Sequence, residues 1–321
     1  MGQMCLRFVV LTLGTCMAIL GSGWVGNTVS AVVSQNETDE VRVAVTVVDQ
    51  MGRPVSELSQ AAFSVFDGKK PQPITFFSNQ DSPASVAIVF DTSESTSDGR
   101  GRIGPNSLRA IQPLTDFVRQ SDSRNEYFIV GFNENASVLL NGVSDTEKAV
   151  AALGNIRTTP FKGNSSFFDV CYSALKELNA RRHSKKILIV VSDGEDSYSR
   201  AETDDVKRVL LEDNVVVYAF YSGTFPIKTG PDGKNPQGPK NLEKLSELSG
   251  GQVFYPKAEA EFHKGAAQMT AELHAQYVLG FTPSKSVTRG KCYEFKINLV
   301  KTTNELLRLR SRDGYCLRKA P

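Results

Sequence analysis

Carboxylate and hydroxyl side chains follow directly on an apolar segment in the first third of the chain. Residues 86–90 form a short, continuous apolar run rich in β-branched residues, and Asp91, Ser93 and Ser95 come next in a D-x-S-x-S pattern. Such a run is typical of a parallel strand buried on both faces. Ligands of open α/β sheets bind outside the carboxyl ends of the strands. The pattern alone fits either a ligand site or a turn that ends the strand.

Two later loops carry side chains of the same kind. One contains Ser165, just before a predicted helix, and the other contains Asp193, just after a predicted apolar strand. Loops of this kind can converge at one edge of a doubly wound sheet. Because hydroxyl and carboxylate oxygens are hard ligands, a metal held there would be Mg²⁺, Mn²⁺ or Ca²⁺ rather than zinc or copper.

Alternating strand and helix patterns surround these loops. Helical periodicity is found at 106–119, 145–155, 166–180, 201–211, 242–248 and 259–274. Strand patterns are found at 126–132, 137–140, 186–191, 214–221 and 252–255. Repeated strand–helix units predict an α/β fold with a doubly wound, mostly parallel, Rossmann-like sheet. Residues 222–241 are rich in Gly, Pro, Lys and Asn and predict a long exposed loop.

Strand alternation also flanks this α/β region at both ends. Residues 41–47 alternate valine with other residues, and 63–66 precede Asp67-Gly68, which is typical of a hairpin. Apolar and polar residues alternate again over 293–299 and 307–312. We expect these terminal segments to pair into a small β module, with the α/β region inserted between them.

The C-terminal β segment carries two further features. Cys292 and Cys316 flank what is predicted to be the last hairpin, and a disulfide between them is expected in an oxidising compartment. The row of arginines over 308–312 predicts a solvated strand face. Cys171 falls within an apolar helical pattern and is expected to be a buried free thiol.

The N-terminus has the pattern of a secretory signal peptide. Arg7 precedes an apolar stretch at 8–20, and Val-Ser-Ala at 29–31 predicts cleavage after Ala31. The apolar stretch is shorter than the ~20 residues of a spanning helix. We therefore expect a secreted, periplasmic or cell-surface protein with no stable membrane anchor after cleavage.

Composition and motifs restrict the remaining functions. With 321 residues and 40% hydrophobic content the chain is long enough to bury a sizeable core. Lys and Arg (37) nearly balance Asp and Glu (35), so nucleic acid is not an expected partner. The phosphate-binding glycine motifs, G-x-S-x-G and H-E-x-x-H are absent from the expected positions.

Taken together, the three loops resemble the von Willebrand factor A family, which includes integrin I domains. The resemblance is to its metal-ion-dependent adhesion site, D-x-S-x-S, then a Thr, then an Asp that opens a D-G turn. It implies that Ser93 and Ser95 bind the metal directly, while Asp91 and Asp193 hold metal-bound waters or serine hydroxyls. Ser165 falls where the family has Thr, which keeps the hydroxyl and loses the methyl group. The implied metal is Mg²⁺, or Mn²⁺ or Ca²⁺.

The chain as a whole resembles secreted bacterial proteins with a von Willebrand factor A-related domain. The supporting stretches are 45–49, 52–55, 63–73, 91–95, 192–196, 249–251, 276–283 and 311–315. The resemblance implies a signal peptide (1–31), an N-terminal β segment (32–82), a von Willebrand factor A domain (83–275) and a C-terminal β segment (276–321).

The expected site favours binding over catalysis. If hydroxyls contact the ion and carboxylates stay farther out, the metal keeps much of its positive charge and attracts an acidic side chain from a partner protein, as ligands of the resembled family do. A hydrolase needs a base beside metal-bound water, and Glu94, the nearest acid, is expected to face solvent. We expect a metal-dependent adhesion or protein-binding module that is not an enzyme. The alternative is a structural or assembly domain that binds no metal. A metal-dependent hydrolase is the third and least favoured interpretation.

Overall fold

The computed structural model describes most of the chain after residue 39. The described ranges are 40–227, 236–284, 287–288, 290–300 and 306–317. The predicted signal peptide lies outside them, as does part of the loop predicted at 222–241. Within these ranges every helix falls short of the length and apolar character that a membrane span requires.

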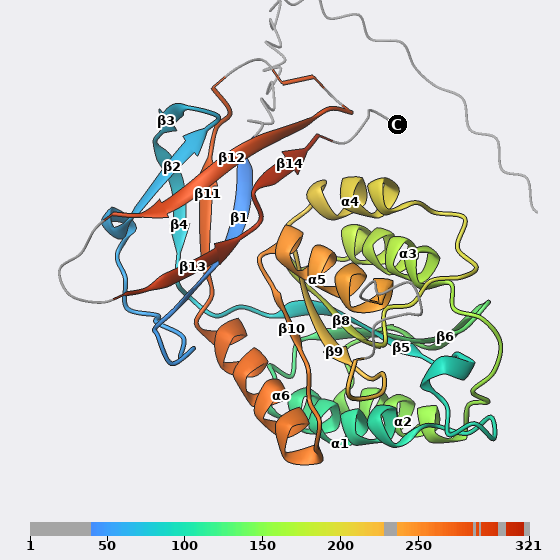
Figure 1. The fold of residues 1–321 in the computed structure, drawn as a ribbon. Helices are drawn as coiled ribbons and strands as arrows, with labels where there is room; N and C mark the ends of the chain where they lie inside the picture. The colour runs from blue at the N-terminus through green and yellow to red at the C-terminus, as the bar shows by residue number, and fades with distance from the viewer. Residues whose placement is uncertain (1–39, 228–235, 285–286, 289, 301–305, 318–321) are drawn as a thin grey trace, which may run out of the picture. The chain divides into compact units, whose positions relative to one another are not determined.

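A six-stranded sheet forms the centre of the α/β region (Figure 1). Its strands are β5 (Ala84–Asp91), β6 (Glu126–Phe132), β7 (Ala136–Val143), β8 (Lys185–Ser192), β9 (Val215–Tyr221) and β10 (Gln252–Phe254). The spatial order is β10-β9-β8-β5-β6-β7, and every neighbouring pair is parallel except β6 with β7. The predicted doubly wound, mostly parallel sheet is confirmed.

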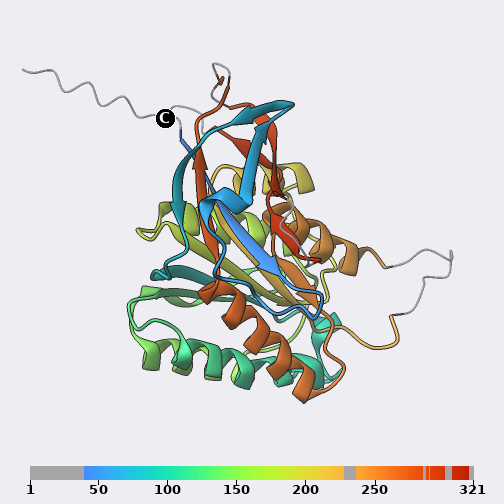
Figure 2. The same cartoon turned by 90° about the vertical axis from the view of Figure 1, so that its left-hand side faces the viewer.

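Helices cover both faces of this sheet. Those on one face are α1 (Pro105–Gln120), α2 (Thr146–Asn155) and α6 (Glu259–His274), and those on the other are α3 (Phe167–Ala180), α4 (Thr203–Leu211) and α5 (Gln237–Ser249) (Figures 1 and 2). Along β5, Ile88 and Phe90 pack with the first group, whereas Ala87 and Val89 pack with the second. Burial on both faces explains why the apolar run of β5 does not alternate.

The terminal segments form two four-stranded antiparallel sheets, called here the β module. Its strands are β1 (Val41–Val48), β2 (Phe63–Asp67), β3 (Lys70–Gln72), β4 (Ile74–Ser78), β11 (Tyr277–Phe281), β12 (Cys292–Leu299), β13 (Arg308–Ser311) and β14 (Gly314–Cys316). The orders are β13-β1-β11-β4 and β14-β12-β2-β3, and both sheets contribute to one hydrophobic core. Because β1 pairs with β11 and β13, the expected pairing of the chain's two ends is confirmed.

Three short 3₁₀ helices complete the described elements. They are η1 (Gln60–Ala62), η2 (Glu94–Thr96) and η3 (Ile156–Thr158). Helix η2 begins inside the D-x-S-x-S pattern, so that pattern marks both the end of a strand and the start of a turn.

Two predictions about local structure are wrong. Helix α5 begins at Gln237, not at residue 242, because Pro239 lies in its first turn, where a missing backbone N–H costs no intrahelical bond. The last strands do not form a hairpin, since β12 pairs with β2 and β14 while β13 pairs with β1 in the other sheet.

The arginine row is solvated only in part, since Arg308 is exposed whereas Arg312 is buried and Arg310 is partly buried. Arg310 forms an ion pair with Glu272, a fully buried residue of α6 that also accepts a hydrogen bond from the Tyr218 hydroxyl at 3.0 Å. Arg312 is buried, and burial lowers its pKa to about 10. Its guanidinium donates at 2.8–2.9 Å to the backbone carbonyl oxygens of Leu211, Asp213 and Arg42. These arginines connect the β module to the α/β region.

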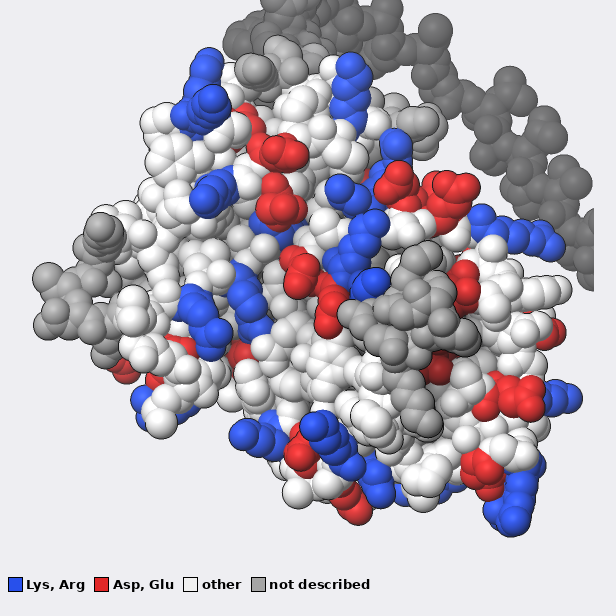
Figure 3. Space-filling view, in the orientation of Figure 1, with Lys and Arg blue, Asp and Glu red and all other residues white. Residues whose placement is uncertain are grey.

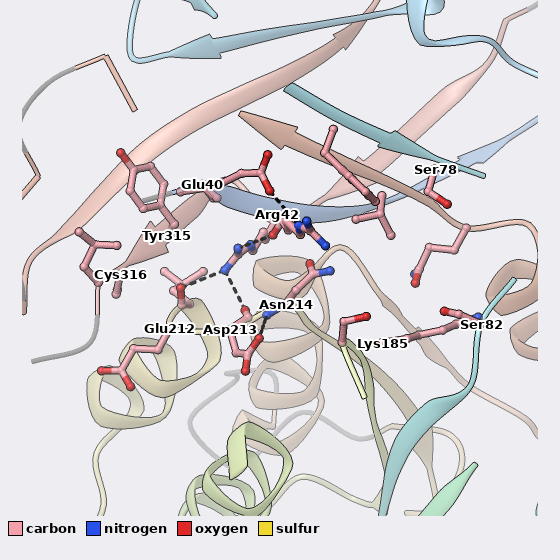
Figure 4. Close-up of a pocket in the computed structure, with 18 of the residues that line it drawn as sticks. Glu40, Arg42, Ser78, Ser82, Lys185, Glu212, Asp213, Asn214, Tyr315 and Cys316 are labelled. Atoms are coloured by element: carbon pink, nitrogen blue, oxygen red, sulfur yellow. Dashed lines mark hydrogen bonds and ion pairs between the residues drawn. The ribbon is translucent and has the colours of Figure 1, made fainter. Parts of the chain in front are cut away.

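A cavity of about 450 Å³ lies between the β module and the amino ends of β8 and β9 (Figure 4). Several of its charged side chains already have partners. Glu40 pairs with Arg42 at 2.9 Å, and Lys185 pairs with Asp81 at 2.7 Å. Because the cavity lies at the amino ends of β8 and β9, it is at the edge of the central sheet opposite to the D-x-S-x-S pattern, which follows the carboxyl end of β5.

The expected disulfide is present. Cys292 of β12 and Cys316 of β14 are directly opposite each other and are bonded, while Cys171 is a buried free thiol whose pKa is raised by burial.

We expect the Cys292→Ala/Cys316→Ala variant to unfold with a free energy about 3 kcal/mol lower than the native chain. The bond joins two residues with a sequence separation of 24. A cross-link over a loop of this size lowers the entropy of the unfolded chain, which raises the free energy of the unfolded state by about 3 kcal/mol. Urea unfolding measures the difference. A reductant should destabilise the native chain and leave the variant unchanged; equal sensitivity of the two would contradict the prediction.

Replacing Arg310 with Met should destabilise the fold by about 3 kcal/mol, because the Glu272 carboxylate would stay buried without its cation. The double variant Arg310→Met/Glu272→Gln, which also removes the negative charge, should recover part of this loss in the same urea titration. If single and double variants were equally unstable, the ion pair would not be the cause.

Candidate metal site

The carboxyl end of β5 lies at the point where the strand order reverses. From β5 the chain continues to β6 on one side, and it later returns to β8 on the other side. Because β5 and β8 are parallel neighbours, their carboxyl ends meet at one edge of the sheet. Asp91 ends β5 and Asp193 follows β8, so both acids lie at the position where open α/β sheets bind ligands.

Asp91 is fully buried and held by its neighbours. One carboxylate oxygen accepts the Ser93 amide N–H at 2.9 Å, and the other accepts the Ser192 hydroxyl at 2.6 Å. The Ser192 oxygen in turn accepts the Gly194 amide N–H at 2.8 Å. Sequence reasoning did not single out Ser192, although its place between the buried strand and Asp193 was a usable signal.

Ser93 and Ser95 lie side by side. Their hydroxyl oxygens are 3.1 Å apart, and Ser93 is buried whereas Ser95 is exposed. The Thr96 hydroxyl donates to the Asp91 and Ser93 carbonyl oxygens at 3.2 and 3.0 Å, which fixes the turn that follows β5. The site therefore opens to solvent at Ser95.

Ser165 belongs to a loop that is bonded to the turn after β5. The Lys162 amide donates to the Thr92 carbonyl oxygen, and the Glu94 amide donates to the Gly163 carbonyl oxygen, both at 3.0 Å. The Ser165 hydroxyl is buried and has no hydrogen-bond partner among the described residues. A buried hydroxyl without a partner is costly, so this oxygen is available to a ligand.

Asp193 is buried at the start of a tight turn. Its carboxylate accepts the Glu195 amide N–H at 3.1 Å, and the Asn241 side-chain amide donates to the Gly194 carbonyl oxygen at 2.9 Å. A side chain at Gly238 would place its Cβ 2.3 Å from the Asp193 carbonyl oxygen. The start of α5 therefore packs against this turn only because residue 238 is a glycine.

The two acids repel each other. Burial, and next the negative charge of Asp193, raise the pKa of Asp91 to about 7. A cation between them would remove this penalty. Within the described residues no three His, Cys, Asp or Glu side chains gather where they could hold a metal, so a metal here would depend on the serine hydroxyls as well. Hydroxyls with two carboxylates fit a hard cation such as Mg²⁺.

Comparison with known proteins finds a domain model similar to the central part of this chain. Residues 86–195 match the model of the von Willebrand factor type A domain. This match includes most of β5, all of β8 and all five predicted site residues. A comparison with the curated proteins found no match.

Solved structures with a similar fold include proteins from animals and bacteria. Proximal thread matrix protein 1 from the mussel byssus, solved with a zinc-occupied MIDAS motif, is 18% identical with a TM-score of 0.49 over 63% of this chain and 48% of its own. A mutant form of the PilB minor pilin from Streptococcus sanguinis is 12% identical, with a TM-score of 0.48 and 64% of each chain covered. A von Willebrand factor type A protein from Catenulispora acidiphila is 12% identical, with a TM-score of 0.45 over 89% of this chain and 76% of its own. This chain thus spans less than two thirds of the byssus protein and of the PilB mutant.

The raised pKa of Asp91 predicts a pH dependence of stability in the metal-free chain. The folded chain keeps a proton on Asp91 that the unfolded chain releases above about pH 4, so the free energy of unfolding should fall as the pH rises from 4 to 7. Urea unfolding with a chelator present measures this fall. Asp91→Asn, which cannot ionise, should become progressively more stable than the native chain over that range; a constant difference would contradict the prediction.

Proposed function

We propose that this chain is a secreted protein that binds a partner protein through a divalent metal, preferably Mg²⁺, at the site of Asp91, Ser93, Ser95, Ser165 and Asp193. The observation that carries the proposal is the buried, unpartnered Ser165 hydroxyl in a loop bonded to the turn after Asp91. Ser93, Ser95 and Ser165 would offer hydroxyl oxygens to the ion, and the two acids would balance its charge. When bound, the metal would supply an electrophilic position for an acidic side chain of the partner.

Several features favour binding over catalysis. The serine hydroxyls are neutral ligands, which leave much of the ion's positive charge for a partner carboxylate. Ser95 is exposed, so a partner can approach from its side. Glu94 is also exposed, and its backbone is bonded to Gly163. A solvated acid of this kind is a poor candidate for a base held against metal-bound water, and we propose no enzymatic activity.

Other features support the proposed location and partner class. The Cys292–Cys316 disulfide suits an oxidising compartment, as does the N-terminal sequence pattern. On the face shown in Figure 3, basic and acidic side chains are interspersed. A nucleic-acid surface is expected to gather basic residues instead, so we propose a protein partner.

Mg²⁺ or Mn²⁺ should raise the melting temperature of the intact chain, because an ion that binds only the folded state stabilises it. Asp91→Asn and Ser165→Ala should each abolish the rise. Differential scanning calorimetry with the metal or with a chelator measures it. Without metal, Ser165→Ala should be at least as stable as the native chain, since the variant removes a buried hydroxyl that has no described hydrogen bond to offset its cost.

Asp116→Ala is the matched control. Asp116 is an acid of α1 that bonds to Gln112, and its loss should leave the metal response intact. If neither ion shifts the melting temperature of the native chain, the alternative of a structural domain that binds no metal is favoured.

A further inference from the structure

Tyr198 is an exposed aromatic residue beside the candidate metal site. It lies between β8 and α4, and 57% of its surface is exposed. Its amide donates to the Ser165 carbonyl oxygen at 3.0 Å, so the residue is bonded to a candidate metal ligand. Other large exposed side chains, such as Met51 and Leu306, lie next to β1 and β13 in the β module.

The loop that carries Tyr198 is fixed by hydrogen bonds both before and after this residue in the sequence. Before it, the Asp196 carboxylate accepts the Phe168 amide N–H at 3.2 Å, and the Ser197 amide donates to Ser165 at 3.0 Å. After it, the Asp169 carboxylate accepts the amides of Arg200 and Ala201 at 3.1 and 2.8 Å. The loop is thus fixed to the start of α3. A loop whose backbone is already fixed loses little further backbone entropy when a partner covers it.

The same loop of residues 162–165 separates Tyr198 from the exposed Ser95. On one side Gly163 accepts the Glu94 amide, and on the other side Ser165 accepts the Tyr198 amide. A partner that reaches the metal position beside Ser95 therefore also meets the surface that carries Tyr198.

We propose that Tyr198 is an apolar anchor for the protein partner, so that the partner offers an acidic residue to the metal and an adjacent apolar side chain to the Tyr198 ring. This inference rests on the proposed function. Rigid, exposed tyrosines are among the residues that contribute most to protein interfaces. Lys162 and Arg200 are exposed nearby in the two loops and disfavour a cationic side chain over the ring. The fitting partner is an acidic segment with an apolar neighbour.

The test uses a phage library of random linear peptides, selected on the intact chain in Mg²⁺ and eluted with a chelator. Selected peptides are synthesised, and their affinities are measured by calorimetry for the native chain and its variants. We expect peptides that combine an acidic residue with a neighbouring apolar one. Tyr198→Ala should weaken their binding about tenfold, whereas Tyr198→Phe and the control Met51→Ala should leave it unchanged.

The outcomes separate the two proposals. Metal-dependent peptides that bind Tyr198→Ala as tightly as the native chain would overturn the role of Tyr198 and leave the proposed function standing. A selection that yields no metal-dependent peptide would contradict the proposed function and this inference with it. The Mg²⁺ response of the melting temperature should be the same in Tyr198→Ala and the native chain, which distinguishes a lost partner contact from a damaged metal site.

Discussion

Two buried carboxyl groups at one edge of the parallel sheet impose the main constraint on the candidate site. Asp91 and Asp193 are close because β5 and β8 are parallel neighbours that end at the same level. Burial, and next the negative charge of Asp193, raise the pKa of Asp91 to about 7, so that Asp91 keeps a proton up to about that pH. The hydrogen bonds from Ser93 and Ser192 only partly offset this cost. When Asp91 is ionised, a cation would lower this cost, and the nearby hydroxyls would supply further oxygens for such an ion.

Hydrogen bonds connect the loops at this edge to one another and to neighbouring elements. The loop of residues 162–165 is bonded to the turn after β5 and to the segment that carries Tyr198. The start of α5 is bonded to the Asp193 turn through Asn241. Because each loop is fixed by backbone hydrogen bonds, the hydroxyls of Ser93 and Ser165 are positioned before any ligand arrives, and Ser95 and Tyr198 face solvent. Such pre-organisation favours a binding surface.

The β module is joined to the α/β region by two arginines, one partly buried and one buried. Arg310 pairs with Glu272 of α6, and Arg312 is bonded to backbone carbonyls at the end of α4 and after it. Since the module is built from both ends of the described chain, the α/β region is attached to it through β4–β5 and α6–β11. The candidate site lies at the opposite edge of the central sheet, away from the contacts of the module.

The sequence by itself determined the central sheet, several element boundaries and the position of the acids at the strand ends. The predicted elements at 126–132 and 259–274 coincide with β6 and α6, because hydrophobic periodicity is a local property. Tertiary structure alone decided the ion pair of Arg310, the burial of Arg312, the start of α5, and the contacts of Ser192 and Tyr198. Alternating arginines look the same in a solvated strand and in one facing Glu272. Their contacts are with carboxylate and carbonyl oxygens that are far away in sequence, and only the folded chain brings those oxygens near.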